Sequence, residues 1–262
     1  MNIIVFIKQV PDTATRIKIA PGGKNIDEAD ITWIISPYDE YAVEEALKIK
    51  ESKATGKVTV MSLGPERAAT SLRNALAMGA DDAIHLLDPA FDGSDAFCTA
   101  KILSAAVQKR PHDILFFGKM GVGMDQSQVP AMVAELLDLP LISQIAKLEV
   151  GEGKAIAHRE IEGATEKVEC SLPAVFAAEK GLNEPRYPSL KGIMAAKKKP
   201  LEVMNAAGLE LNPEEIGSKG SKVTLVSLAL PPARQAGKIL QGEAQETAAQ
   251  LVKLLHEEAK VI

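Results

Sequence analysis

Apolar and polar residues alternate in long blocks along the first half of the chain. Continuous apolar runs, which are typical of parallel strands buried on both faces, occur at residues 2–8, 57–64, 82–87 and 113–118. Segments with apolar residues at helical spacing lie between these runs, at residues 38–51, 65–78 and 94–109. Strands that alternate with helices predict an α/β fold built on a doubly wound parallel sheet.

The pattern changes after residue 140. Short strands with short connections, which favour antiparallel additions to the sheet, are predicted at residues 144–150, 154–162, 166–171 and 173–179. Residues 181–200 follow; they are rich in proline and charge, show no regular period, and are predicted to project as a loop. A further strand is expected at residues 222–229.

The C-terminal residues predict a separate element. A proline-rich arm is followed by a helical pattern over about residues 243–258. A chain that leaves its core through a long arm is expected to wrap around a partner. We therefore expect an α/β domain over residues 1–230, which includes the loop 181–200, and a C-terminal arm with its helix over residues 231–262.

Composition and charge argue against several classes of function. A net charge of -5 and a pI near 5.5 argue against bulk nucleic-acid binding, which usually accompanies a strongly basic domain. The apolar N-terminus is short and lacks a basic region before it, so it predicts a strand rather than a signal peptide, and a cytoplasmic protein. Cys98 and Cys170 stand far apart, and the four histidines match neither a metal site nor a catalytic triad. The sequence therefore favours binding over catalysis.

Three polar stretches follow predicted strands or open a predicted helix, at residues 8–13, 36–39 and 118–129. Ligands of open α/β sheets bind beyond the carboxyl ends of the strands, near the point where the strand order reverses. Gly118, Gly121 and Gly123 let the backbone approach a ligand closely, and the loop continues into a helix N-terminus, which favours phosphate. Neither a Walker A ending nor the dinucleotide fingerprint is present. The loop therefore indicates either phosphate binding or a tight strand-to-helix turn.

Several motifs resemble those of electron transfer flavoprotein β subunits. Residues 181–200, which begin Gly181-Leu182-Asn183-Glu184-Pro185-Arg186-Tyr187, resemble the recognition loop of that family. Residues 157–176 are similar to the family signature, from which Ala164 and Phe176 depart slightly. Residues 42–46 and 75–81 match as well, and the resemblance covers roughly residues 2–232.

The resemblance implies a heterodimer with an α subunit that holds most of an FAD, while this chain binds AMP on an adenine-nucleotide alpha-hydrolase-like fold. Such a heterodimer is an electron carrier rather than a self-sufficient enzyme. By resemblance, the residues that line the nucleotide site are Phe6, Ser36, Pro37, Tyr38, Asp39, Leu63, Met124, Asp125, Gln126, Ser127, Gln128, Val129, Pro130, Ala131 and Met132.

The resemblance also implies contacts with other proteins. Leu190 matches the leucine that anchors the recognition loop in a partner dehydrogenase, and Tyr187 and Ile193 belong to the same motif. Glu160 corresponds to a carboxylate that interacts with the mobile flavin domain. The basic run 197–199 is either a solvated surface or an element of electrostatic steering.

Three functions remain open at this point. The resemblance implies electron transfer from acyl-CoA-type dehydrogenases to a quinone-linked oxidoreductase. Residues 10–13, however, resemble the electron-bifurcating branch of the family, whose β subunits bind a second FAD in place of AMP and oxidise NADH. Residues 123–130 lack the first Asp and the last Gly of the loop in that branch. A nucleotide-binding regulatory module without a redox role is the alternative from another class.

Overall fold

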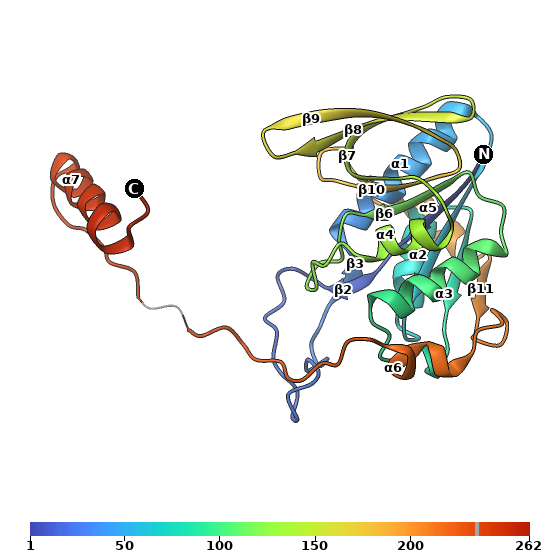
Figure 1. The fold of residues 1–262 in the computed structure, drawn as a ribbon, viewed down its shortest axis with the longest axis horizontal. Coiled ribbons are helices and arrows are strands. Elements are labelled where there is room, and N and C mark those ends of the chain that lie inside the picture. Colours follow the sequence, from blue (N-terminus) through green and yellow to red (C-terminus); the bar gives the residue numbers. More distant parts are fainter. Residues whose placement is uncertain (234–235) are drawn as a thin grey trace. The chain divides into compact units, whose positions relative to one another are not determined.

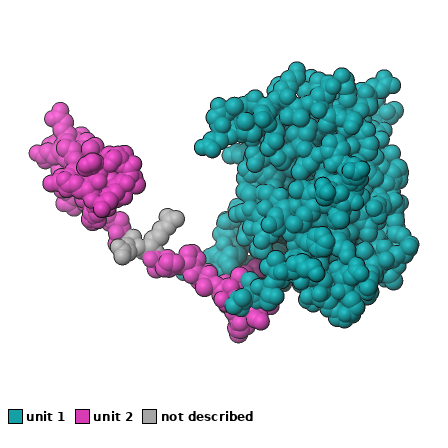
Figure 2. Space-filling model, viewed as in Figure 1, with its two compact units in different colours: residues 1–17, 28–226 teal, residues 18–27, 227–262 magenta. Residues whose placement is uncertain are grey.

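The computed structural model describes residues 1–233 and 236–262, which form two compact units (Figures 1 and 2). The larger unit comprises residues 1–17 and 28–226, and the smaller unit comprises residues 18–27 and 227–262. The short segment 18–27 therefore groups with the C-terminal residues, which the sequence pattern does not indicate.

One large sheet organises the larger unit. Nine of the described strands form it in the order β11-β5-β4-β1-β6-β10-β7-β8-β9. Their bounds are β1 Asn2–Phe6, β4 Lys57–Leu63, β5 Asp82–Leu86, β6 Ile114–Gly118, β7 Leu141–Val150, β8 Lys154–Ile161, β9 Ala164–Ser171, β10 Ala174–Ala178 and β11 Leu201–Met204. The parallel strands β4 and β6 flank β1, so the strand order reverses between β1 and β6. The predicted α/β fold is confirmed.

Helices cover both faces of the parallel strands. One face carries α1 Pro37–Lys53, α2 Ala68–Met78 and α5 Leu190–Ala196, and the other carries α3 Ala96–Gln108 and α4 Val129–Leu136. Ile3 and Val5 of β1 face the first layer, while Ile4 and Phe6 face the second. The continuous apolar run of β1 follows from burial on both faces.

The structure also contains several smaller elements. A separate antiparallel pair joins β2 Gln9–Pro11 to β3 Trp33–Ile35. Short helices are present at η1 Pro89–Phe91, η2 Pro213–Glu215 and α6 Gly217–Gly220. In the smaller unit, α7 Ala244–Leu254 continues into η3 Leu255–Ala259, which confirms the helix predicted near residues 243–258.

Two strand predictions need correction. The expected antiparallel pairing holds for β7–β8 and β8–β9, but β10 is inserted between β6 and β7 and pairs in parallel with both. Residues 222–229 form no strand, although the apolar residues Val223 and Leu225 alternate there as a strand would require. Both side chains are exposed, and none of the described strands of the sheet pairs with this segment.

The predicted loop 181–200 is also corrected, because it contains α5 and leads into β11. The side chain of Ser189 caps α5 by accepting a hydrogen bond from the N–H of Gly192. A Cβ at Gly192 would collide with the carbonyl oxygen of Ala77, so the glycine lets α5 lie close to the end of α2. This seven-residue helix is too short for its period to stand out in the sequence.

A buried carboxyl fixes the first helix to the sheet. Asp39, in the first turn of α1, accepts hydrogen bonds from the backbone N–H groups of Lys8 (2.7 Å) and Gly118 (2.9 Å). These two residues stand at the carboxyl ends of β1 and β6, on either side of the point where the strand order reverses. Burial raises the pKa of Asp39 to about 7, although the two N–H groups and the Lys8 ammonium act in the opposite direction.

Gly118 permits this arrangement. A Cβ at residue 118 would lie 2.5 Å from Oδ1 of Asp39 and 2.6 Å from both the carbonyl carbon and the Cβ of Tyr38. These distances are far below van der Waals contact, and Asp39 is buried and held by its two hydrogen bonds. The first turn of α1 would therefore have to move away from the sheet to admit any side chain here.

We predict that Gly118→Ala destabilises the protein by about 1–3 kcal/mol, as overpacking of a filled interior usually does. The change should appear as a lower melting temperature than that of Gly151→Ala. Gly151 is a matched control, since its Cβ would meet the nearest atom at 3.4 Å, which is ordinary contact. Equal melting temperatures for the two variants would show that α1 tolerates displacement.

Candidate functional site

The carboxyl ends of β1 and β6 meet the N-termini of α1 and α4 at one edge of the sheet. The structure brings several predicted residues together there: Phe6 at the end of β1, Ser36 to Asp39 at the start of α1, and the loop 119–128. Phe6 is buried and stacks on Phe117 of β6, with ring centroids 4.1 Å apart. Phe6 therefore forms part of the floor beneath this edge rather than an exposed surface.

The loop 119–128 connects β6 to α4 and has an unusual backbone. Gly123, Asp125 and Ser127 have φ angles of 97°, 51° and 53°. Positive φ is uncommon for residues other than glycine, and such strain concentrates at ligand sites. The backbone N–H groups of Gln126 and Ser127 donate no hydrogen bond within the described part of the chain. Free N–H groups before a helix N-terminus favour an anion.

A cation stands next to this loop. The Cβ position of Gly121 lies 2.8 Å from Cδ and 3.2 Å from Nζ of Lys8, so the glycine makes room for the lysine side chain. Partial burial lowers the pKa of Lys8, while the carboxyl groups of Asp39 and Asp125 oppose that shift. Lys8 lies in the predicted stretch 8–13 but was not among the residues assigned to the nucleotide site. Its position close to the carboxyl end of β1 was the feature of the sequence that could have identified it.

Two contacts hold the loop against α1. The side-chain oxygen of Ser36, which is fully buried, accepts a hydrogen bond from the N–H of Val122 at 3.5 Å. The ammonium of Lys119 lies 4.9 Å above the ring of Tyr38 and 2.6 Å from a carboxylate oxygen of Glu179. Residues 36–39 therefore hold the loop in place through the side chains of Ser36 and Tyr38.

The predicted stretch 124–132 divides into two parts. Met124 through Gln128 are exposed loop residues, and Met124 is 64% exposed. Val129 through Met132 begin α4, where Pro130 is buried and Val129 and Met132 pack against the core. The first part faces solvent at the sheet edge, whereas most of the second part is structural.

A cavity of about 610 Å³ lies at the carboxyl ends of the neighbouring strands β4 and β5. Leu63 lines it, together with Gly64, Phe91, Ser94 and Thr99. Of the residues predicted for the nucleotide site, Leu63 alone belongs to this lining within the described chain. The volume is in the range of small-molecule sites. Residues 87–89 and 91–94, which the sequence analysis did not assign to a site, also line this cavity.

The residues predicted to contact partners are all on the surface. Tyr187, Leu190 and Ile193 are 96%, 82% and 45% exposed, and Met194, which was not predicted, is 72% exposed. Glu160 is exposed on β8.

The basic run 197–199 is divided between two environments. Lys199 donates hydrogen bonds to the carbonyl oxygens of Leu76 and Ala80 at the end of α2, so it is a structural residue rather than part of a solvated surface. Lys197 and Lys198 are exposed.

The described residues hold Cys98 and Cys170 as free thiols. Within the same residues, no group of three His, Cys, Asp or Glu side chains is arranged to hold a metal ion. None of the helices in the described part of the chain is long and apolar enough to cross a membrane.

Comparison with known proteins identifies the family. A family model described as the electron transfer flavoprotein domain matches residues 24–209. Proteins named electron transfer flavoprotein subunit beta from Thermoanaerobacterium thermosaccharolyticum and Bacillus subtilis are each 43% identical, over 98% of both chains and 100% of both chains respectively. The caffeyl-CoA reductase-Etf complex subunit CarD of Acetobacterium woodii is 36% identical over 98% of both chains. This chain belongs to the electron transfer flavoprotein family, as a β subunit.

Proposed function

We propose that this chain pairs with an α subunit and binds AMP, while the α subunit holds most of an FAD. The heterodimer carries electrons from acyl-CoA-type dehydrogenases to a quinone-linked oxidoreductase. The observation that carries the nucleotide assignment is the loop 119–128, with its left-handed residues and free N–H groups before α4. It stands at the reversal point of the sheet, where nucleotides bind in such folds.

The residues at the sheet edge suit a nucleoside monophosphate. The N–H groups of Gln126 and Ser127 would hold the phosphate, and the ammonium of Lys8, which lies against Gly121 of the same loop, would add positive charge. The cavity next to Leu63 would take the nucleoside, because its volume of about 610 Å³ is ample and its lining includes Phe91. AMP supplies no redox chemistry, so in this role it fills and stabilises the fold. Flavin in the α subunit supplies the electron transfer.

The smaller unit supports the proposed partnership with an α subunit. Along α7, Leu251 and Val252 are 48% and 56% exposed, and none of its described residues is buried. Apolar residues of a stable helix normally pack against another surface. We assign residues 231–262 to packing on the α subunit.

The exposed apolar residues in α5 and just before it support the proposed contact with a dehydrogenase. Tyr187, Leu190 and Met194 are together called the docking patch below. A patch of this kind on a soluble surface usually marks an interaction site. Glu160, exposed on β8, is assigned to contact with the mobile flavin domain.

A second candidate function is electron bifurcation, in which this chain holds a second FAD instead of AMP and the complex oxidises NADH. The similarity to subunit CarD of a caffeyl-CoA reductase-Etf complex favours it. The sequence of residues 10–13 favours it as well, whereas the loop 123–130 lacks two residues of that branch. A regulatory module without flavin is disfavoured by membership of the family.

Ser127→Asp is expected to weaken nucleotide retention, because it places a negative charge beside the phosphate. Even in a well-solvated site, this repulsion is about 1 kcal/mol, or roughly five-fold in affinity. Ser127→Asn is the matched control, since Asn tolerates the positive φ of residue 127 and adds no charge. The readout is AMP per purified complex. Equal AMP content in the two variants would remove this loop from the site.

Leu190→Ala is expected to weaken binding to the donor dehydrogenase without destabilising the protein, because its side chain is 82% exposed. Burial in a partner's pocket would contribute about 1.5–3 kcal/mol, or roughly ten- to over a hundred-fold in affinity. The measurements are the KM for an acyl-CoA dehydrogenase reduced by its substrate, and the melting temperature. Leu136→Ala, on α4, is the control. A lower melting temperature with an unchanged KM would contradict the anchor assignment.

A further inference from the structure

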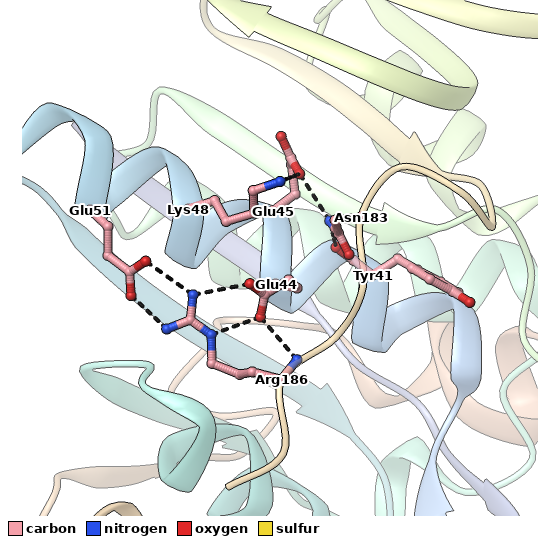
Figure 3. Close-up of polar contacts among 7 residues, drawn as sticks. All are labelled: Tyr41, Glu44, Glu45, Lys48, Glu51, Asn183 and Arg186. Atoms are coloured by element: carbon pink, nitrogen blue, oxygen red, sulfur yellow. Dashed lines mark hydrogen bonds and ion pairs between the residues drawn. The ribbon is translucent and has the colours of Figure 1, made fainter. Parts of the chain in front are cut away.

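The chain between β10 and α5 has no regular secondary structure, yet two side chains tie it to α1 (Figure 3). Nδ2 of Asn183 donates hydrogen bonds to the carbonyl oxygen of Tyr41 (3.0 Å) and to a carboxylate oxygen of Glu45 (2.9 Å). Arg186 follows three residues later and makes a larger set of contacts. Tyr187, the next residue, is 96% exposed. Arg186 is therefore the last attachment before the docking patch begins.

The guanidinium of Arg186 is held by two carboxylates of α1. Its Nε and Nη2 donate to the two oxygens of Glu44 at 2.8 and 3.0 Å, and its Nη1 and Nη2 donate to the two oxygens of Glu51 at 2.5 and 3.0 Å. The backbone N–H of Arg186 also donates to Glu44, at 3.2 Å. The side chain of Glu44 is 8% exposed and that of Glu51 is 57% exposed.

This geometry needs arginine. Both carboxylates are bound in a two-pronged manner, which only the planar guanidinium can do. A lysine would keep the positive charge but would place it at one point, so it could not hold both carboxylates in the same way. The variant Arg186→Lys therefore separates the effect of the positive charge from the effect of the two-pronged hydrogen bonding.

The C-terminal end of α5 is fixed by a different set of contacts. Nη1 of Arg73, on α2, donates to the carbonyl oxygens of Ala196 (2.7 Å) and Lys199 (2.8 Å). In return, the ammonium of Lys199 donates to Leu76 and Ala80 at the end of α2. The docking patch thus lies between two anchors, one on α1 and one on α2.

We propose that Arg186 is a positioning residue, which fixes the docking patch in the geometry that the partner recognises before the partner binds. The inference rests on the proposed docking function of α5. Ordering a segment during association opposes binding, and a segment that is already ordered avoids this loss. The patch has exposed apolar side chains on a backbone anchored at both ends, which is the arrangement that preorganised binding requires.

The experiment uses the complete heterodimer with four variants: Arg186→Gln, Arg186→Lys, Glu51→Gln and the control Arg110→Lys. Arg110 has a similar exposure, 32% against 33%, and pairs with Glu202 of β11, away from α1. The KM and kcat with a substrate-reduced acyl-CoA dehydrogenase are measured, together with melting temperature and hydrogen exchange of residues 183–196. Both Arg186 variants should raise KM about ten-fold, change kcat little and speed exchange in this segment.

Glu51→Gln should produce a smaller increase in KM, because Glu44 still holds the guanidinium. It keeps the inference testable if the Arg186 variants do not fold. The control Arg110→Lys should leave KM unchanged. Faster exchange in residues 183–196 with unchanged KM would overturn the inference, as would a loss confined to kcat or to melting temperature.

A double-mutant cycle with Leu190→Ala separates this inference from the function on which it rests. If Arg186 acts through the docking patch, the combined Arg186→Gln and Leu190→Ala variant should lose less affinity than the sum of the two single losses. Additive losses would overturn the positioning role. If Leu190→Ala alone leaves KM unchanged, the proposed docking function itself fails, whatever Arg186 does.

Discussion

The buried carboxyl of Asp39 ties together the parts of the structure on which its proposed function depends. It accepts hydrogen bonds from the ends of β1 and β6, so it sets the start of α1 against the two strands where the sheet reverses. The loop 119–128 begins directly after β6 and rests on Ser36 and Tyr38 of the same helix terminus. Farther along α1, Glu44 and Glu51 hold Arg186 beside the docking patch (Figure 3). One helix therefore supports both the proposed nucleotide site and the proposed docking patch.

Most of the parallel core could be predicted from the sequence, because its signals are local. The strands β1, β4, β5 and β6 are continuous apolar runs, and α1, α2 and α3 show helical spacing. The predictions that were wrong concern elements whose structure depends on contacts between residues distant in the sequence. The position of β10 between β6 and β7 is set by pairing with strands far away along the chain. Its continuous apolar run, which is buried throughout, is of the kind that parallel strands show, but its place after the antiparallel strands predicted another antiparallel addition. The helix α5 forms where a loop was expected, because Gly192 and Arg73 secure it against α2.

The local features of the candidate site could likewise be predicted from the sequence, whereas the contacts between its separate segments could not. The glycines and the following helix N-terminus indicated either phosphate binding or a tight turn, and the structure adds the left-handed residues Asp125 and Ser127. Residues 8–13 were singled out as a candidate stretch, but Lys8 was not assigned to the site, since its approach to Gly121 arises only when β1 and β6 align. The segment 87–94 was not assigned either, since it meets Leu63 only when β4 and β5 lie side by side. Leu63 was named by resemblance, but the cavity that it lines could not be inferred from its type or spacing.

The central claim is that this β subunit holds AMP while the flavin belongs to the α subunit. Denaturing the purified heterodimer and quantifying the released nucleotides by chromatography tests it directly. The account predicts one AMP and one FAD per heterodimer. Two FAD without AMP would assign the chain to electron bifurcation, and a complex that releases no flavin would contradict the electron-carrier function altogether.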